Sequence, residues 1–133
     1  MKVVLDTKQI QSMNMFQGLT NSSVMDCMED GGDIYFVVGE GQYGLAVGKN
    51  GAKVKNAERA FKKSIKLIEY SPDMEQFIRN MIHDAQHIKA DGNLVHVRIK
   101  PSSRSRIIGK NGSNIRIMNH FLKRLFGAEM KIK

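Results

Sequence analysis

Two identical tetrapeptides, Gly48-Lys49-Asn50-Gly51 and Gly109-Lys110-Asn111-Gly112, offer the clearest chemistry in this sequence. In each, the two glycines allow backbone conformations and close approaches that a Cβ atom would prevent. The lysine adds a positive charge, and the asparagine adds hydrogen-bond donors and tolerates a positive φ angle. A helix that follows such a loop presents its N-terminal amides to an anion. We therefore predict two loops that contact phosphate groups.

The two motifs belong to a longer repeat. The second copy starts 61 positions after the first, and the two copies follow apolar pairs, Ala46-Val47 and Ile107-Ile108. A strand-like run starts 15 positions before each copy, at Asp33–Val38 and at Leu94–Ile99. One short motif can arise by chance, but two copies in the same register with their neighbours indicate a duplicated module.

Both halves of the chain predict the order helix, strand, strand, helix, motif, helix, strand. In the first half, the expected segments are 6–17, 23–29, 33–38, 42–47, a helix from 52 and a strand at 65–68. In the second half, they are a helix from Ser71-Pro72-Asp73, strands at 86–90 and 94–99, segment 102–108, a helix bearing Ile115, Met118, Leu122 and Leu125, and a strand at 130–132. A proline at the first helical position marks the boundary. We predict two domains, residues 1–70 and 71–133.

Basic residues are concentrated in the two segments that carry the motifs. The chain has a net charge of +8; residues 41–68 contribute +6 and residues 101–133 contribute +7, whereas residues 1–40 contribute −4 and residues 69–100 contribute −1. A polyanion is the simplest partner for this distribution. The alternative is that the lysines only solvate helix faces.

The rest of the composition limits the class of protein. The single cysteine, Cys27, excludes an intramolecular disulfide framework and leaves no cysteine cluster for a metal. At the start of the chain, Lys2 and Asp6 interrupt the sequence too early for the apolar region of a signal peptide. No apolar run approaches the roughly 18 residues of a membrane span. We expect a cytoplasmic protein with no membrane partner.

With its element order and its loop between two helices, the chain resembles tandem K-homology (KH) domains of the prokaryotic type, type II. Met13-Asn14-Met15-Phe16, Tyr35-Phe36-Val37-Val38 and the two motifs extend the resemblance to short archaeal NusA-like transcription factors. The resemblance covers nearly the whole chain. It implies an α+β fold of two KH modules, each with three helices on one face of a three-stranded sheet. In the KH family, the Gly-x-x-Gly loop lies against the backbone of four single-stranded nucleotides.

Arginines distinguish the second motif from the first. Arg104 and Arg106 stand where the first half has Tyr43 and Leu45, and Arg116 follows the second motif. Because arginine binds phosphate bidentately and stacks on bases, we expect the second module to dominate affinity. Aliphatic residues beside the motifs either line a floor for bases or belong to the core. The expected RNA-binding residues are Val47, Gly48, Lys49, Asn50, Gly51, Lys53, Arg104, Arg106, Ile108, Gly109, Lys110, Asn111, Gly112 and Arg116.

Two other patterns suggest different functions. Gly39–Gly44 matches the Gly-x-Gly-x-x-Gly of dinucleotide-binding proteins, with Glu69 as a candidate ribose ligand. Against this function, Gly48 interrupts the following helix and the second half has no counterpart. His83 and His87 have the i, i+4 spacing of a metal-binding pair on a helix, but histidines are also favoured near a helix C-terminus.

We expect a binding protein for single-stranded RNA that is not an enzyme and has no catalytic residues, metal ligands, cofactor or small-molecule substrate. The resemblance implies a transcription termination or antitermination factor that contacts nascent RNA, with RNA polymerase or other transcription factors as candidate partners. An RNA-binding factor in ribosome assembly is an alternative. A dinucleotide-dependent enzyme and a protein-interaction module whose loops no longer bind RNA are rivals from other classes.

Overall fold

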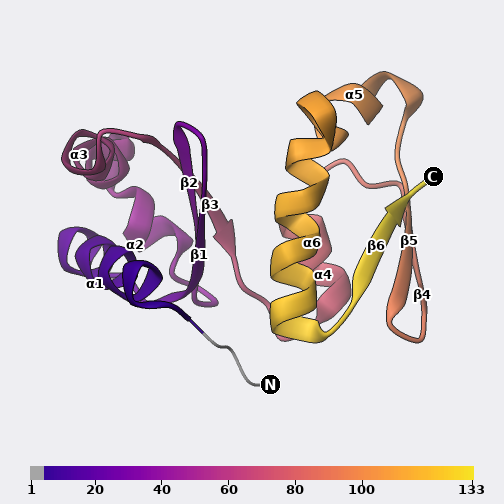
Figure 1. The fold of residues 1–133 in the computed structure, drawn as a ribbon, viewed down its shortest axis with the longest axis horizontal. Coiled ribbons are helices and arrows are strands. Elements are labelled where there is room, and N and C mark those ends of the chain that lie inside the picture. The colour runs from indigo at the N-terminus through magenta and orange to yellow at the C-terminus, as the bar shows by residue number, and fades with distance from the viewer. Residues whose placement is uncertain (1–4) are drawn as a thin grey trace. The chain divides into compact units, whose positions relative to one another are not determined.

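The computed structural model describes residues 5–133, which divide into two compact units. The amino-terminal unit ends at Pro72, and the carboxy-terminal unit begins at Asp73. Each unit contains one three-stranded sheet with helices, so the protein is α+β (Figure 1). Residues 1–4, on which the signal-peptide argument partly rests, lie outside the described part. No helix among residues 5–133 is both long and apolar enough to cross a bilayer.

The amino-terminal unit places its motif on a crossover connection. Its elements are α1 (Thr7–Thr20), β1 (Val24–Asp30), β2 (Asp33–Val38), α2 (Tyr43–Val47), α3 (Ala52–Phe61) and β3 (Ser64–Glu69). Strand β2 is central; it pairs antiparallel with β1 and parallel with β3. Because parallel neighbours need a long connection, the chain between β2 and β3 forms α2, a 3₁₀ turn at Lys49–Gly51, and α3.

Local signals in the sequence explain where the first elements begin and turn. The side chain of Asp6 accepts a hydrogen bond from the Gln9 amide at 2.7 Å, and the Gln9 side chain accepts one from the Asp6 amide at 3.1 Å. This reciprocal capping box makes Asp6 the N-cap of α1. In the predicted β1–β2 hairpin, Gly31 has a φ of +61°, which the tight turn requires.

The three helices of the amino-terminal unit share one core with the inner face of its sheet. Phe16 of α1 stacks on Phe36 of β2 with ring centroids 4.2 Å apart, and Phe61 of α3 lies 5.6 Å from Phe36. The same cluster contains Met13, Cys27, Ile34, Val38, Ala46, Ala57 and Ile65. Because every helix and every strand of the unit contributes to it, this core holds α2 and α3 against the sheet and so positions the motif between them.

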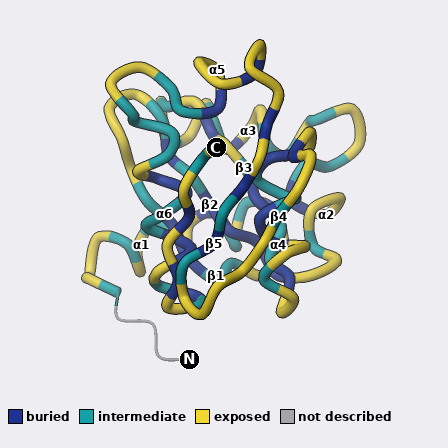
Figure 2. The backbone as a smooth tube through the Cα atoms, turned by 90° about the vertical axis from the view of Figure 1, so that its right-hand side faces the viewer, coloured by how far each residue is buried: buried dark blue, intermediate teal, exposed yellow. Residues whose placement is uncertain are grey.

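The carboxy-terminal unit repeats the same order. Its elements are α4 (Met74–Met81), β4 (His87–Asp91), β5 (Leu94–Arg98), α5 (Arg104–Ile108), α6 (Ser113–Phe126) and β6 (Glu129–Ile132), with 3₁₀ turns at Pro101–Ser103 and Lys110–Gly112. Central strand β5 pairs antiparallel with β4 and parallel with β6. Strand β4 is exposed along most of its length (yellow in Figure 2).

Helices α4 and α6 cover one side of this second sheet (Figure 1). Val95 and Val97 of β5 and Met130 of β6 are buried beneath them. The Phe77 ring of α4 lies 5.4 Å from the Phe126 ring of α6. Alternate residues of β5 therefore point into the core, and the residues between them point to the opposite side of the sheet.

One expectation for the second half is wrong in detail. Helix α4 begins at Met74 rather than at Ser71, because the Tyr70 amide donates to the Val38 carbonyl at 2.8 Å and Asp73 keeps an extended backbone. In α6, Ile115 is only half-buried. The buried residues of α6 are Ile117, Met118, Phe121, Leu122 and Leu125. The helix bears Ile115, Met118, Leu122 and Leu125 as expected, and its buried face also includes Ile117 and Phe121 because α6 packs against both α4 and β6.

A side chain near the middle of the last helix in each unit holds the strand that follows it. In the amino-terminal unit, the Glu58 carboxylate accepts a hydrogen bond from the Ile65 amide at 3.0 Å. In the carboxy-terminal unit, Asn119 accepts from the Met130 amide at 2.8 Å and donates to the Met130 carbonyl at 3.2 Å. Asn119 therefore ties α6 to β6 through both polar groups of one residue.

Replacing Asn119 with alanine should destabilise the protein because both backbone groups of Met130 lose their side-chain partner. We expect Asn119→Ala to lower the free energy of unfolding by about 1–3 kcal/mol, measured by urea denaturation. The control is Asn56→Ala, at an exposed position of α3, which should cause no loss. Equal stabilities for the two variants would show that the hydrogen bonds between Asn119 and Met130 do not stabilise the fold.

Candidate nucleic-acid interface

The two Gly-Lys-Asn-Gly loops have the same backbone conformation. Gly48 and Gly109 have φ/ψ angles of 76°/173° and 80°/171°. Asn50 and Asn111 have φ angles of 56°, in the left-handed region. In each loop, the amide of the last glycine donates to the carbonyl of the first at 3.1 Å. Two segments far apart in the sequence thus build one local structure twice.

Steric contacts explain why each loop begins with glycine. A Cβ atom on Gly48 would lie 2.7 Å from Cγ of Lys53 and 3.0 Å from the Lys53 amide nitrogen. A Cβ on Gly109 would lie 2.9 Å from the amide nitrogen of Asn114. The following helix therefore packs directly against the loop, and a side chain at the first position would push the two apart.

The middle residues of both loops are available to a ligand. Lys49, Asn50, Lys110 and Asn111 are all exposed. The loops lead directly into α3 and α6, and no side chain caps either helix at its N-cap glycine. Each loop thus combines a lysine charge with the positive end of a helix dipole.

Other predicted site residues of the amino-terminal unit have mixed surroundings. Lys53 donates from Nζ to the Thr20 carbonyl at 3.0 Å, so its charge lies against the C-terminal end of α1 rather than in the loop. Val47 is half-buried. Tyr43 and Leu45, at the positions of the arginines in the second unit, are both 46% exposed.

In the carboxy-terminal unit, Asp84 holds one of the predicted arginines. Arg106 donates to a carboxylate oxygen of Asp84 at 2.9 Å, and the hydroxyl of Ser103 donates to the same oxygen at 2.9 Å. The Ser103 hydrogen bond lowers the pKa of Asp84 most, and the Arg106 guanidinium lowers it further. Asp84 is therefore an anion that competes with any phosphate for Arg106.

The other arginines of this unit differ in their contacts. Arg116 donates to the Asn111 carbonyl and so bends back over the loop. The Asn114 side chain donates to the Arg106 carbonyl at 3.0 Å, which connects α6 to the end of α5. Arg104 is exposed, and Ile108 is half-buried beside the loop. Arg106 therefore contacts the α4–β4 connection, whereas Arg116 contacts the loop itself.

Sequence reasoning missed Asp84 as a member of this site. It lies in the connection between α4 and β4, and only the fold brings it to Arg106, which is 22 positions away. No spacing pattern signals this contact. The sequence did point to Tyr43 and Leu45, because they align with Arg104 and Arg106 in the repeat.

The two alternative sites are the histidine pair and the Gly39–Gly44 segment. His83 follows the end of α4 and His87 is the first residue of β4, so the two histidines do not share a helix face. Among residues 5–133, no group of three or more His, Cys, Asp or Glu side chains is placed to hold a metal ion. In the Gly39–Gly44 segment, the Gly41 amide donates to the Glu69 carboxylate at 3.3 Å.

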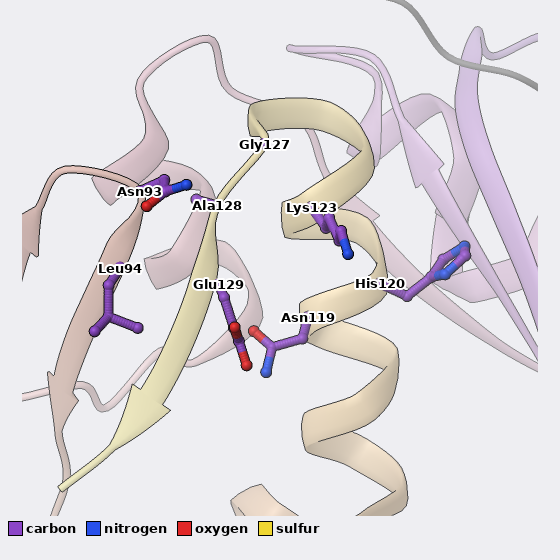
Figure 3. A pocket seen from close by; sticks show the side chains of 8 residues that line it. All are labelled: Asn93, Leu94, Asn119, His120, Lys123, Gly127, Ala128 and Glu129. Carbon is purple, nitrogen blue, oxygen red and sulfur yellow. The ribbon is translucent and has the colours of Figure 1, made fainter.

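A cavity of about 440 Å³ lies away from the motifs, at the C-terminal end of α6 (Figure 3). Its lining residues are Asn93, Leu94, Asn119, His120, Lys123, Gly127, Ala128 and Glu129. Burial lowers the pKa of His120, and the nearby Arg124 lowers it further. Asn119 is already bonded to Met130, and the cavity includes no loop residue.

The comparisons with known proteins agree with this fold. No protein-family model matches the chain. The crystal structure of APE1850 superimposes with a TM-score of 0.78 at 24% identity, covering 97% of this chain and 100% of that one. A probable transcription termination protein NusA from Methanococcus vannielii is 42% identical over 121 residues, 86% of this chain and 70% of the relative. Its namesake from Methanocaldococcus jannaschii is 35% identical over 129 residues, 92% of this chain and 70% of the relative.

Two small three-stranded sheets with helices, each carrying a glycine loop between two helices, make this an α+β protein with a fold consistent with the KH-like class. The sequence identity and coverage shared with the two NusA relatives define the family. The chain belongs to the archaeal NusA family, whose members are named probable transcription termination proteins.

Two glycine-to-alanine substitutions, one in the second loop and one in α2, should change the free energy of unfolding in opposite directions. Gly109→Ala introduces a Cβ at a φ of +80° and against α6, so we expect a loss of about 1–3 kcal/mol in the free energy of unfolding. Gly44→Ala, inside α2 with nothing within 4 Å of the new Cβ, should gain about 0.5–1 kcal/mol. Chemical denaturation measures both. A Gly109→Ala protein as stable as the wild type would contradict the described loop.

Proposed function

We propose that this chain is a tandem of type II KH modules that binds single-stranded RNA through its two Gly-Lys-Asn-Gly loops. The observation that carries the proposal is that one loop conformation occurs twice, each time with an exposed lysine and asparagine at the start of a helix. A structural role alone would not require the same exposed cation in both copies. Phosphate groups of one strand would lie against Lys49 and Lys110.

The proposed RNA-binding surface beside the two loops has few aromatic side chains on which bases could stack. Half-buried Val47 and Ile108 lie beside the loops, and Tyr43 is the exposed aromatic residue near the first of them. Each module alone is therefore expected to bind modestly, because base stacking supplies much of the affinity in other single-strand binders. Two modules on one chain raise the effective concentration of the second contact.

The biological step that we propose is transcription termination or antitermination, acting on nascent RNA. This step follows from family membership, since the relatives are named probable transcription termination proteins. RNA polymerase or other transcription factors are the proposed protein partners. We propose no catalytic activity, because the loops offer cations and amides but no paired nucleophile and base.

Reversing the charge of both loops should abolish binding without unfolding the protein. We expect the variant with Lys49, Asn50, Lys110 and Asn111 all changed to Asp to lose most of its affinity for single-stranded RNA. For the wild type, log K should fall against log salt by about 0.7 per phosphate neutralised. Fluorescence anisotropy across a salt series measures affinity and slope together.

The control carries the same four types of substitution at exposed positions outside the loops: Asn56→Asp, Lys62→Asp, Asn93→Asp and Lys123→Asp. Both variants change the net charge equally, so a general electrostatic effect would weaken them alike. If the folded loop variant binds as the wild type does, or no worse than the control, the loops are scaffolding and the proposal fails.

Removing Asp84 should strengthen RNA binding. The Asp84→Asn substitution frees Arg106 from its ion pair, so we expect a higher affinity and a salt slope steeper by about 0.7, one added phosphate contact. Glu75→Gln, at an exposed position of α4, removes the same charge away from Arg106 and serves as the control. An unchanged slope in Asp84→Asn would mean that Arg106 does not contact the strand.

A further inference from the structure

The outer face of the carboxy-terminal sheet carries a cluster of basic residues that the loop site does not use. Figure 1 shows α4 and α6 on one side of this sheet, and no element of the same unit on the other. Residues paired across the strands share a face, so the register defines the cluster. We call it the cationic sheet face; it consists of His87, Lys89, His96, Arg98 and Lys131.

Three permanent cations lie close together on this face. Lys89 pairs with His96, and His96 pairs with Lys131. Arg98, two residues beyond His96, is therefore the diagonal neighbour of both lysines, at about 7–8 Å. This spacing is within the Debye length of about 8 Å at physiological salt, so both lysines repel Arg98. All three are exposed.

No acid in the described part of the chain forms an ion pair with these cations. Among residues 5–133, Lys89, Arg98 and Lys131 form no ion pair. The acids of the same face, Asp91 and Glu129, flank Leu94 at the hairpin end of the sheet. The arrangement therefore costs folding stability, and an external polyanion would relieve the cost.

The fold itself does not require cations at these positions. In the amino-terminal sheet, the corresponding outer-face residues are Met28 for Lys89, Tyr35 for His96 and Val37 for Arg98, and only Lys66 matches Lys131. Burial raises the pKa of Tyr35, and Asp33 and Asp30, which lie on the same face, raise it further. Of the two sheets, only the carboxy-terminal one has a basic outer face.

We propose that the cationic sheet face binds the phosphodiester backbone of RNA, as a second contact for a strand that also occupies the second loop. The inference rests on the proposed RNA-binding function. Continuity supports it: the chain runs from Arg98 at the end of β5 through exposed Lys100 to exposed Arg104 at the start of α5 and on to the motif. An RNA long enough to pass beyond the loops would follow these charges across the sheet.

The test compares short and long RNA with a variant that changes Lys89, Arg98 and Lys131 to Gln. An unstructured RNA of about 4 nucleotides fills one loop site, and one of about 30 nucleotides extends beyond it. We expect the variant to bind the short RNA as the wild type does. For the long RNA, its salt slope should fall by about 2 and its affinity about a hundredfold at about 0.1 M salt.

Matched controls separate this site from general charge effects and from misfolding. The variant Lys8→Gln, Lys62→Gln and Lys66→Gln removes three exposed lysines from the amino-terminal unit and should keep the wild-type slope on the long RNA. Thermal unfolding at low salt should show a midpoint for the sheet-face variant at or above that of the wild type, because repulsion is removed.

The outcomes also distinguish this inference from the proposed function. If the sheet-face variant binds long RNA with wild-type affinity and slope, the inference is overturned whatever the loops do. If it loses long-RNA binding while the loop variant does not, the sheet face binds RNA without the loops, so the loop proposal and the second-contact inference both fail. If it loses binding only to vesicles of anionic phospholipid, the face is a membrane-surface site and the inference is wrong.

Discussion

The positive φ angle of the first glycine in each motif is the constraint on which the rest of the site depends. At Gly48 and Gly109 the chain leaves a short helix, turns, and enters a long helix whose first turn lies within 3 Å of where a Cβ would be. This turn exposes Lys49 and Lys110, and it sets the start of α3 and α6. Because each long helix supplies core residues for its sheet, the loop and the core are built by the same elements.

The two units use one fold with different surroundings for the loop. In the amino-terminal unit, exposed Tyr43 and Leu45 stand before the motif, and Lys53 is bonded to the end of α1. In the carboxy-terminal unit, arginines take the places of Tyr43 and Leu45, and Asp84 holds Arg106. The two loops are identical in sequence, but the exposed residues before them are apolar or aromatic in the first unit and cationic in the second.

Electrostatics acts on this protein at two levels. The local level is the ion pair of Arg106 with Asp84, which sets how readily one arginine reaches a ligand. The broader level is the uneven distribution of charge along the chain, with the basic segments around the motifs. Only the paired strands of the carboxy-terminal sheet bring Lys89, Arg98 and Lys131 from three separate segments to one face.

The sequence by itself determined the repeated motif, the element order and the glycine loops, because each depends on residues close together in the chain. Tertiary structure decided the rest. It delayed the start of α4 past Pro72, widened the buried face of α6, joined Asp84 to Arg106, and set β2 and β5 at the centre of mixed sheets. These features depend on contacts between residues far apart in sequence, and local propensity and spacing carry no information about which distant segments pair.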